Sequence, residues 1–547
     1  MKLIGLFIFF AVVKSCKVIV QTQYGAICGT IKTSRSPIKQ LVFYKHFTGI
    51  PYAKPPIGDL RFQEPQPPLP WNEIRNATTP GHPCTQITNM FIGDEVIGNE
   101  DCLTLEVSVP MHVSFGHNSK LPVMVWIHGG SFLFSSYLET GSDYFMEERV
   151  VFVGINYRLN VFGFLSTLDG SAPGNMGLKD QTMALIWIRN NIANFGGDPS
   201  RVTIFGASAG GAAVQFHLLS LLSKGLFQQA ISHSGVALNT WSFQRNPREM
   251  AIRVGAALGI ITNDTKVLVN ELRKIPAQQL LKTAFDQNVT GFFLLYDEVP
   301  FLPSLEHESH KAFLSKRVYE SLKSGRFATV PYIIGHTTEE GSFPYEYFDL
   351  KYYDLNIYNI DPTLFIPISM NIPKGSPNIN YTLNAIKQQF FRNTSFTEKV
   401  NWIKFMGQDV RGIRKSADFA CQQLHHQVFY YIFSYVGTNN LSYIGGAGHY
   451  SDVLKILYPD NPQWSNEVTR SDRIVQKRML KLWTNFASTG KPTTNVLGSL
   501  HWPEFCENKK YLEIGNDLVV KSQPDSEMMT FWDNVFHMYG IPPFNTY

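Results

Sequence analysis

The sequence predicts a doubly wound α/β fold, in which helices cover both faces of a mostly parallel central sheet. Residues 121–127 and 150–157 are apolar throughout and rich in β-branched and aromatic side chains, which is typical of strands buried on both faces. Residues 180–195 change to a helical period, and 201–205 return to an apolar strand pattern. Strands and helices that alternate in this way build a parallel sheet with right-handed crossovers.

Each of these elements has recognisable limits. The first strand should end at Gly129 and Gly130, and the helix over 180–195 should be capped by Asp180 and stopped by Gly196 and Gly197. A second helix is expected to begin near Ala209. Further strands are predicted over 330–334 and 428–435, and an amphipathic helix over 528–539.

We predict that residues 17–547 form a single domain. Residues 240–325 are mostly helical by pattern and 345–400 are loop-rich and aromatic, but no polar linker isolates either segment. We therefore interpret both as insertions that roof the sheet over an active-site gorge. The net charge is only +4 and no block of basic residues occurs, which argues against a nucleic-acid partner.

Residues 1–16 resemble a signal peptide. Lys2 is followed by the apolar run 3–13, and Ser15 or Cys16 supplies a small residue for cleavage. That run is shorter than the roughly 20 residues a membrane-spanning helix needs, and no later segment is long and apolar enough. We therefore expect a secreted protein without a membrane span, and glycans at its six Asn-x-Ser/Thr sequons, Asn76, Asn263, Asn288, Asn380, Asn393 and Asn440.

The motif Gly206-Ala207-Ser208-Ala209-Gly210 lies between a predicted strand and a predicted helix. In this context, G-x-S-x-G forms a sharp turn that lifts the serine hydroxyl above the carboxyl ends of the strands. The residues two positions either side of the serine pack closely, so Gly206 and Gly210 must lack side chains. Ser208 is therefore the predicted nucleophile.

A serine nucleophile needs a base and an acid that orients the base, and in this arrangement they follow in the order serine, acid, histidine. The strand over 330–334 leads to Glu339 and Glu340, which the pattern alone does not separate. The strand over 428–435 leads to a glycine-rich loop with His449. His336, His425 and His426 are its rivals, although the last two precede a strand rather than follow one.

Backbone donors for the oxyanion are expected in two places. The loop His128-Gly129-Gly130-Ser131 directly follows the strand over 121–127, and the amide of Ala209 directly follows the nucleophile. Fixed N–H groups at these points stabilise the negative charge that develops on a carbonyl oxygen when the serine attacks.

The chain resembles the type B carboxylesterase and cholinesterase family over nearly all of its length after the signal. The resemblance rests on segments that include FTGIPYAKPPIGDLRFQEP, PVMVWIHGGSF, GNMGLKDQTMALIWIRNNIANFGGDPSRVTIFGASAGG and GHTTEEGSF. It implies the α/β-hydrolase fold, with Glu340 as the acid and His449 as the base. It also implies oxyanion donors at Gly130, Ser131 and Ala209 in a loop shaped by Gly129.

The resemblance further implies a Cys84–Cys102 disulfide and two structural ion pairs, Arg61–Glu100 and Arg158–Asp198. Removal of the signal then leaves Cys28, Cys421 and Cys506, so at least one thiol is expected to be free. Cys421 matches a family disulfide position, but its expected partner region, around residues 528–529, has no cysteine.

The resemblance implies a serine esterase, similar to secreted insect esterases, that hydrolyses small to medium apolar esters of xenobiotic, pheromone or hormone type. No cofactor or metal is expected. The interval between Cys84 and Cys102 has no tryptophan to attract a quaternary ammonium group, so choline esters fit poorly. Ser131 stands where glycine or alanine is usual. The alternative function is a catalytically silent adhesion module of the same fold, against which the complete set of Ser208, Glu340 and His449 argues.

Overall fold

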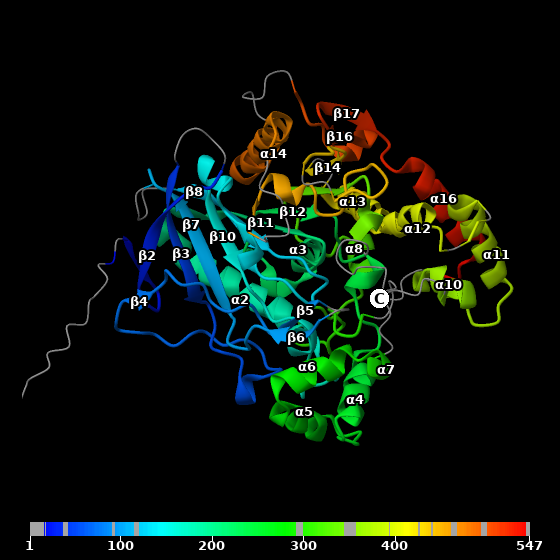
Figure 1. Ribbon diagram of the computed structural model, residues 1–547, viewed down its shortest axis with the longest axis horizontal. Helices are drawn as coiled ribbons and strands as arrows, with labels where there is room; N and C mark the ends of the chain where they lie inside the picture. Colours follow the sequence, from blue (N-terminus) through cyan, green and yellow to red (C-terminus); the bar gives the residue numbers. More distant parts are fainter. Residues whose placement is uncertain are drawn as a thin grey trace, which may run out of the picture.

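The fold is described from a computed structural model of the 547-residue chain, in which a long twisted sheet is flanked by helices (Figure 1). The structure describes residue 16 and residues 18–36, 42–89, 93–113, 120–290, 299–343, 357–392, 394–395, 397–424, 427–438, 441–460, 468–493 and 500–542.

The central part of the sheet is parallel and its edges are antiparallel. The strands lie in the order β1-β2-β3-β7-β10-β8-β11-β12-β13-β14-β16-β17, and β4 (Arg75–Asn76) pairs with β2. The parallel strands are β10 (Val151–Ile155), β8 (Leu121–Ile127), β11 (Gly197–Ala207), β12 (Gln229–His233), β13 (Tyr332–Thr337), β14 (Val428–Phe433) and β16 (Lys510–Ile514). The antiparallel edges are β1 (Val18–Thr22), β2 (Gly25–Thr33), β3 (Phe43–Pro51) and β7 (Thr104–Pro110) on one side and β17 (Leu518–Ser522) on the other. The predicted parallel sheet with helices on both faces is confirmed.

The two faces of the sheet belong to two separate cores. In β8, Val123, Val125 and Ile127 pack with the helices α2 (Met176–Asn191), α3 (Ala209–Leu219) and α13 (Val410–Leu424). Met124 and Trp126 of the same strand point to the opposite face, where α14 (Arg470–Thr489) packs. Because successive side chains of a strand alternate between faces, a strand that is apolar throughout can fill both cores.

Helix α2 begins at Met176, four residues before the cap expected at Asp180. Asp180 lies inside the helix, where its buried carboxylate accepts hydrogen bonds from the backbone N, Nε and Nη2 of Arg158. The acidic residue that looked like a cap therefore forms a buried ion pair, and Asn175, in the left-handed region, precedes the first turn. The remaining predicted elements are present with shifts of a few residues at their ends.

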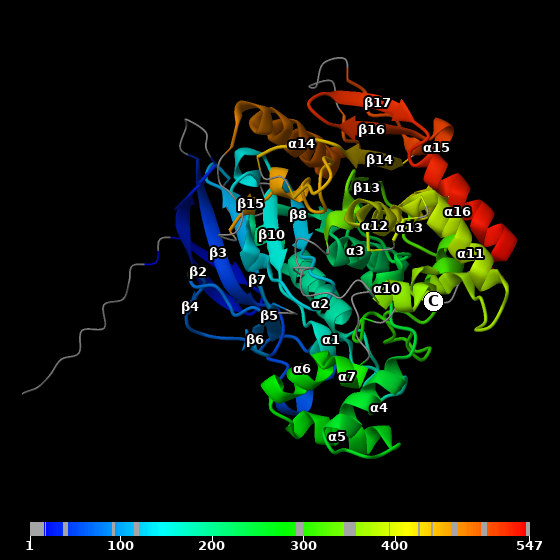
Figure 2. The ribbon, with the colours of Figure 1, turned by 45° about the vertical axis from the view of Figure 1, so that its right-hand side comes forward.

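The insertions form two groups of helices outside the sheet (Figure 2). One group follows β12 and contains α4 (Pro247–Ala257), α5 (Thr265–Lys274), α6 (Ala277–Phe285) and α7 (Gln287–Thr290). Later in the same insertion, α8 (Val318–Lys323) packs against α3 and α13. The other contains α10 (Ile357–Ile360), α11 (Asn378–Ile386) and α12 (Lys399–Met406), and it shares an aromatic core with the C-terminal α16 (Ser526–Tyr539).

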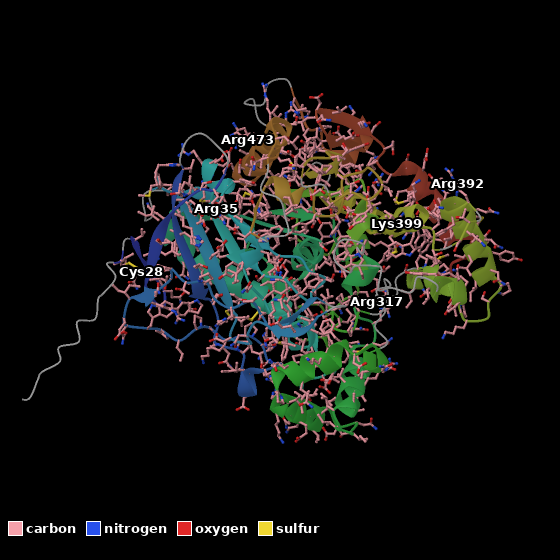
Figure 3. The ribbon with its side chains drawn as sticks, in the orientation of Figure 1. Cys28, Arg35, Arg317, Arg392, Lys399 and Arg473 are labelled. Carbon is pink, nitrogen blue, oxygen red and sulfur yellow. A yellow bond between two sulfur atoms is a disulfide. The ribbon has the colours of Figure 1, made fainter. Side chains whose placement is uncertain are left out.

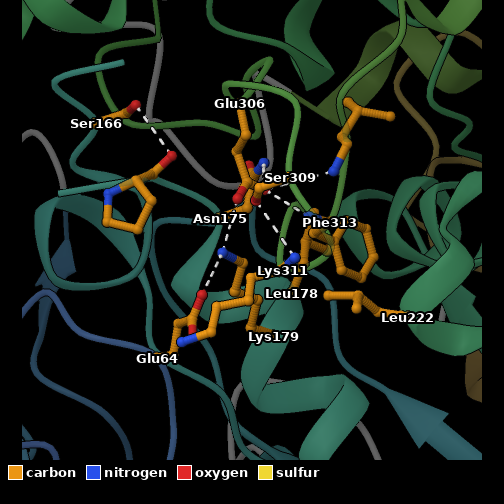
Figure 4. Close-up of polar contacts among 12 residues, drawn as sticks. Glu64, Ser166, Asn175, Leu178, Lys179, Leu222, Glu306, Ser309, Lys311 and Phe313 are labelled. Atoms are coloured by element: carbon orange, nitrogen blue, oxygen red, sulfur yellow. Dashed lines mark hydrogen bonds and ion pairs between the residues drawn. The ribbon is translucent and has the colours of Figure 1, made fainter. Parts of the chain in front are cut away.

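A buried network of polar side chains fastens the segment after residue 299 to α2 (Figure 4). Lys179 lies 2.7 Å from Glu306 and 3.3 Å from Glu64, and Asn175 donates to Glu306 at 2.7 Å. Lys179 and Glu306 are almost fully buried, so each needs the other for compensation of its charge. This network holds the insertion on the same face of the sheet as α2.

Three disulfides are present, and no cysteine of the described residues is free. Cys84–Cys102 has a Cα–Cα distance of 5.0 Å, as the family resemblance implied. The expectation of a free thiol is wrong, because Cys421 on α13 pairs with Cys506 on α15 (Phe505–Asn508), and Cys16 pairs with Cys28 on β2 (Figure 3). The second pairing also conflicts with a leader that ends after residue 16, because the bond requires Cys16. No sequence pattern links Cys421 to Cys506 or Cys16 to Cys28, but the fold brings the two members of each pair together.

Candidate active site

Ser208 occupies a strained turn at the end of β11. Its φ of 57° and ψ of −124° lie outside the regions that L-residues ordinarily adopt. A Cβ at Gly206 would lie 2.5 Å from the backbone of Gly210, and a Cβ at Gly210 would lie 2.1 Å from the carbonyl oxygen of Ile127. The predicted requirement for two glycines thus has a direct steric cause. The serine itself is only 6% exposed.

The candidate triad lies across four adjacent parallel strands. Ser208 follows β11, Ser234 follows β12, Glu340 follows β13 and His449 follows β14, and these strands are neighbours in that order. The carboxyl ends of parallel strands share one edge of the sheet, which is where sites of this fold class form. The amide of Ser208 donates to the carbonyl of His233 at 2.8 Å, which fixes the nucleophile turn to the end of β12.

Glu340 contacts the ring of His449 directly, through a hydrogen bond between Nδ1 and the carboxylate. The same carboxylate accepts bonds from the hydroxyl of Ser234 at 2.6 Å and from the amide of Thr337 at 2.6 Å. Burial would raise the pKa of Glu340, but the charge and hydrogen bond of His449, with further donors around it, hold that pKa below its ordinary value. Glu340 is therefore an ionised partner for the imidazole.

Glu339 points away from His449 and has a different task. Its buried carboxylate accepts hydrogen bonds from the hydroxyl of Ser442 at 3.0 Å and from the amides of Ile444 and Gly446 at 3.1 and 2.8 Å. The side chain therefore folds the loop that leads to His449. Glutamates that were equivalent by sequence pattern thus differ in what they contact.

The other ring nitrogen of His449, Nε2, is buried and makes no hydrogen bond to any residue that the structure describes. No hydrogen bond therefore joins it to Ser208. Catalytic hydrogen bonds are often long before substrate binds. An imidazole held at Nδ1 by a carboxylate with its Nε2 unoccupied can accept a proton.

The loop after β8 approaches the nucleophile closely. A Cβ at Gly129 would lie 2.7 Å from the carbonyl of Ala207 and 3.3 Å from the Cβ of Ser208. Ser131 adopts a left-handed φ of 55°, which explains why glycine suits this position better. Within the described part of the chain, no group accepts a hydrogen bond from the amides of Gly130, Ser131 or Ala209. Their N–H groups are thus available to an oxyanion.

The histidines that competed with His449 lie elsewhere. His336 is the last but one residue of β13, but its Nε2 binds Asp525 at 3.1 Å and its Nδ1 contacts the carbonyl of Thr337. Both nitrogens are occupied, so His336 anchors the start of α16. His425 and His426 lie outside the described residues.

One of the implied ion pairs is present and the other is wrong. Arg61 forms a two-pronged contact with Glu100, as expected. Arg158, however, pairs with Asp180, and Asp198 binds Arg201 at 2.9 Å. No pattern in the sequence indicates this exchange, because Asp180 lies 22 residues after Arg158 and only the packing of α2 brings the two side chains together.

Four sequon asparagines, Asn76, Asn263, Asn288 and Asn380, are exposed, and Asn393 and Asn440 lie outside the described residues. Among the described residues, no helix is long and apolar enough to cross a membrane, and no group of three or more acidic, histidine or cysteine side chains is placed to hold a metal.

A cavity of about 360 Å³ lies among α12, α13 and α16 and is lined by Phe365, Phe405, Trp532 and Phe536, but not by Ser208 or His449. The expected apolar gorge above Ser208 stays a prediction, since residues 291–298 and 344–356 of the insertions lie outside the described part.

The residues that sequence reasoning missed are those that join the triad to its surroundings. Ser234 is the link between the nucleophile turn and Glu340, and its only signal was its place directly after a buried strand. Asp452 supports the His449 loop from a buried position. Its partners, which include His233, had no recognisable motif.

Comparison with known proteins gives consistent matches along the whole chain. The model of the carboxylesterase family matches residues 17–532. A juvenile hormone esterase of Tribolium castaneum is 36% identical over 88% of this chain and 85% of its own length, and a carboxylic ester hydrolase of Bombus ignitus is 34% identical over 94% of each. The crystal structure of juvenile hormone esterase from Manduca sexta, with OTFP covalently attached, superimposes with a TM-score of 0.83 at 27% identity and covers 95% of this chain and 99% of that one.

Proposed function

The chain belongs to the carboxylesterase family and is a carboxylic ester hydrolase, and we propose that it works through an acyl-enzyme formed on Ser208. The observation that carries the proposal is the Glu340–His449 pair, which leaves Nε2 of the imidazole unoccupied at the sheet edge where Ser208 follows β11. The covalent attachment reported for the Manduca sexta enzyme supports a nucleophilic mechanism in this fold.

In the first half of the reaction, Ser208 Oγ attacks the ester carbonyl carbon while its proton passes to His449 Nε2. The carbonyl oxygen becomes an oxyanion, and the C–O bond to the alcohol breaks as His449 returns the proton to the leaving oxygen. In the second half, water attacks the acyl-enzyme, again with His449 as base, and the carboxylic acid leaves. Glu340 stabilises the imidazolium that forms twice in this cycle.

Amides of Gly130, Ser131 and Ala209 serve as donors to the oxyanion. Loss of one such donor typically costs about 3 kcal/mol of transition-state stabilisation. The close approach of Gly129 to Ser208 places this loop beside the nucleophile, and Ala209 is at the N-terminus of α3, where the helix dipole favours negative charge.

We propose small to medium apolar esters of hormone, pheromone or xenobiotic type as substrates, because similar proteins are named as juvenile hormone esterase and carboxylic ester hydrolase. We also propose that the protein is exported. The apolar run over residues 3–13, the exposed sequons and the disulfides all suit an oxidising compartment.

The test is a comparison of Ser208→Ala with the wild-type enzyme on a simple aryl acetate. We expect Ser208→Ala to abolish both turnover and covalent labelling by an organophosphate, with an unchanged melting temperature. Normal hydrolysis by this variant would refute the nucleophile and the mechanism built on it.

A matched pair of variants tests the acid. Glu340→Gln should lower kcat by about 10²–10⁴-fold, because the amide no longer fixes the tautomer or stabilises the imidazolium. Glu339→Gln removes the same charge one residue away and should lower kcat by about tenfold or less, through the loop that it folds. The reverse ranking of the two variants would show that Glu339 is the acid.

A further inference from the structure

A second buried imidazole–carboxylate pair lies behind the nucleophile turn. His233, the last residue of β12, has its Nδ1 2.8 Å from Oδ2 of Asp452, and both side chains are fully buried. Asp452 is three residues after His449, in the turn that carries the proposed base. The proposed reaction uses neither side chain.

The neighbouring indole fixes the state of His233. Nε1 of Trp483, on α14, is 3.0 Å from Nε2 of His233. An indole N–H only donates, so Nε2 must be the unprotonated nitrogen that accepts, and the neutral ring carries its proton on Nδ1, facing Asp452. Both nitrogens are thus occupied, in contrast to His449, whose Nε2 is unoccupied. This second pair is not arranged to exchange protons with a substrate.

Asp452 is held from three directions. Besides His233, it accepts a hydrogen bond from the hydroxyl of Tyr431 on β14 at 2.6 Å and from the amide of Val453 at 2.9 Å. Burial would raise the pKa of Asp452, but His233 and these donors keep that pKa below its ordinary value. The donors to this charged carboxylate lie on the end of β12, on β14 and in its own turn, so it resists displacement in several directions.

His233 also holds the nucleophile, through its main chain. Its carbonyl oxygen accepts the hydrogen bond from the amide of Ser208 at 2.8 Å. His233 therefore binds the nucleophile turn through its backbone and the His449 turn through its side chain. Nε2 of His449 makes no hydrogen bond to any described residue, so the base and the nucleophile do not themselves fix the distance between their two turns.

We propose that His233 and Asp452 are positioning residues that set the separation between Ser208 Oγ and His449 Nε2. This inference rests on the proposed acyl-enzyme function. Small errors in this separation are costly, because a displacement of about 1 Å lowers a rate by about 10²-fold.

The chain offers a matched control for a purely structural role. His217 on α3 is equally buried and also has both nitrogens occupied, by Ser223 Oγ at 2.6 Å and Gln181 Oε1 at 2.8 Å, but neither partner lies on the His449 turn. His217→Gln should therefore lower the melting temperature without a specific effect on chemistry.

The experiment compares Asp452→Asn, Trp483→Phe and His217→Gln with the wild-type enzyme, with kcat expressed per site titrated by an organophosphate. For Asp452→Asn we expect kcat, and the rate of labelling, to fall by about 10–100-fold with KM changed less than about threefold. Trp483→Phe removes the donor that fixes the His233 tautomer, together with part of a buried ring whose loss the melting temperature reports. It tests the inference if Asp452→Asn does not fold, and its kcat should fall by about 3–10-fold. His217→Gln should keep kcat within about twofold of wild type.

Wild-type kcat per titrated site in both Asp452→Asn and Trp483→Phe, with melting temperatures lowered as in His217→Gln, would overturn the inference and leave the cluster a structural one. The Ser208→Ala variant separates this failure from failure of the proposed function. If it is inactive while the cluster variants are normal, only the positioning role is lost. If it is active, the proposed function is lost as well.

Discussion

The substitution Gly210→Ala adds one methyl group where the nucleophile turn meets the sheet. The new Cβ would lie 2.1 Å from the carbonyl oxygen of Ile127, whereas ordinary contacts begin at 3.4 Å, so the two must separate by about 1.3 Å. Ile127 is the last residue of β8 and is paired on both sides, with Gly206 of β11 and Ile155 of β10, and the clashing atom is backbone. The sheet resists this movement, so the nucleophile turn must move instead.

We expect the overpacking to cost about 1–3 kcal/mol of stability. A displacement of Ser208 by about 1 Å should lower kcat/KM by about 10²-fold. The assay is hydrolysis of an aryl acetate together with a thermal melt.

Gly170→Ala is the control for this substitution. Gly170 is exposed, and a Cβ there meets no atom within 4 Å, so both properties should be unchanged. Wild-type kcat/KM in Gly210→Ala would refute the claim that steric exclusion at this glycine sets the position of the nucleophile.

Three further predictions concern the loop, the pH dependence and the N-terminus. Ser131→Gly keeps the backbone donor, so kcat/KM should change by less than about tenfold. The substitution relieves the strain of a left-handed φ, but glycine also has more conformational freedom in the unfolded chain, so these two effects on stability oppose each other and the melting temperature should change little. Burial opposes the charge of His336, but Asp525 raises the pKa of His336 to about 9, above the ordinary value near 6.5. The stability that this pair contributes should be complete below about pH 6.5 and should be lost as the pH rises through 9. The melting temperature, measured across this pH range, should show that loss in the wild type and not in Asp525→Asn. If a leader is removed, the cut should precede Cys16, and peptide mapping of the exported protein should find Cys16 bonded to Cys28; a free Cys28 would contradict the pairing.

The sequence by itself determined the features that depend on neighbours in the chain. The nucleophile turn at Ser208 is local, because Gly206 and Gly210 meet within one turn between a strand and a helix. Such a turn has a recognisable sequence motif. The parallel strands could also be predicted from short segments. A strand that is apolar at every position must be buried on both of its faces, which is typical of a parallel sheet between two layers of helices.

The tertiary structure decided the features that depend on which strands become neighbours. The sequence pattern does not distinguish Glu339 from Glu340, and the resemblance to a family was needed to choose between them. In the structure the loop after β14 gives each a different partner, Gly446 for Glu339 and His449 for Glu340. Asp180 has the sequence position of a cap, yet packing of α2 makes it the partner of Arg158.

The pairing of cysteines and the His233–Asp452 contact have the same origin. The latter joins residues 219 positions apart, and no periodicity or motif in either segment refers to the other. Side chains at the ends of parallel strands meet because the order of strands in the sheet differs from their order in the chain. That order is set by packing of the whole sheet between its helices, which is a property of the assembled core and not of any one segment.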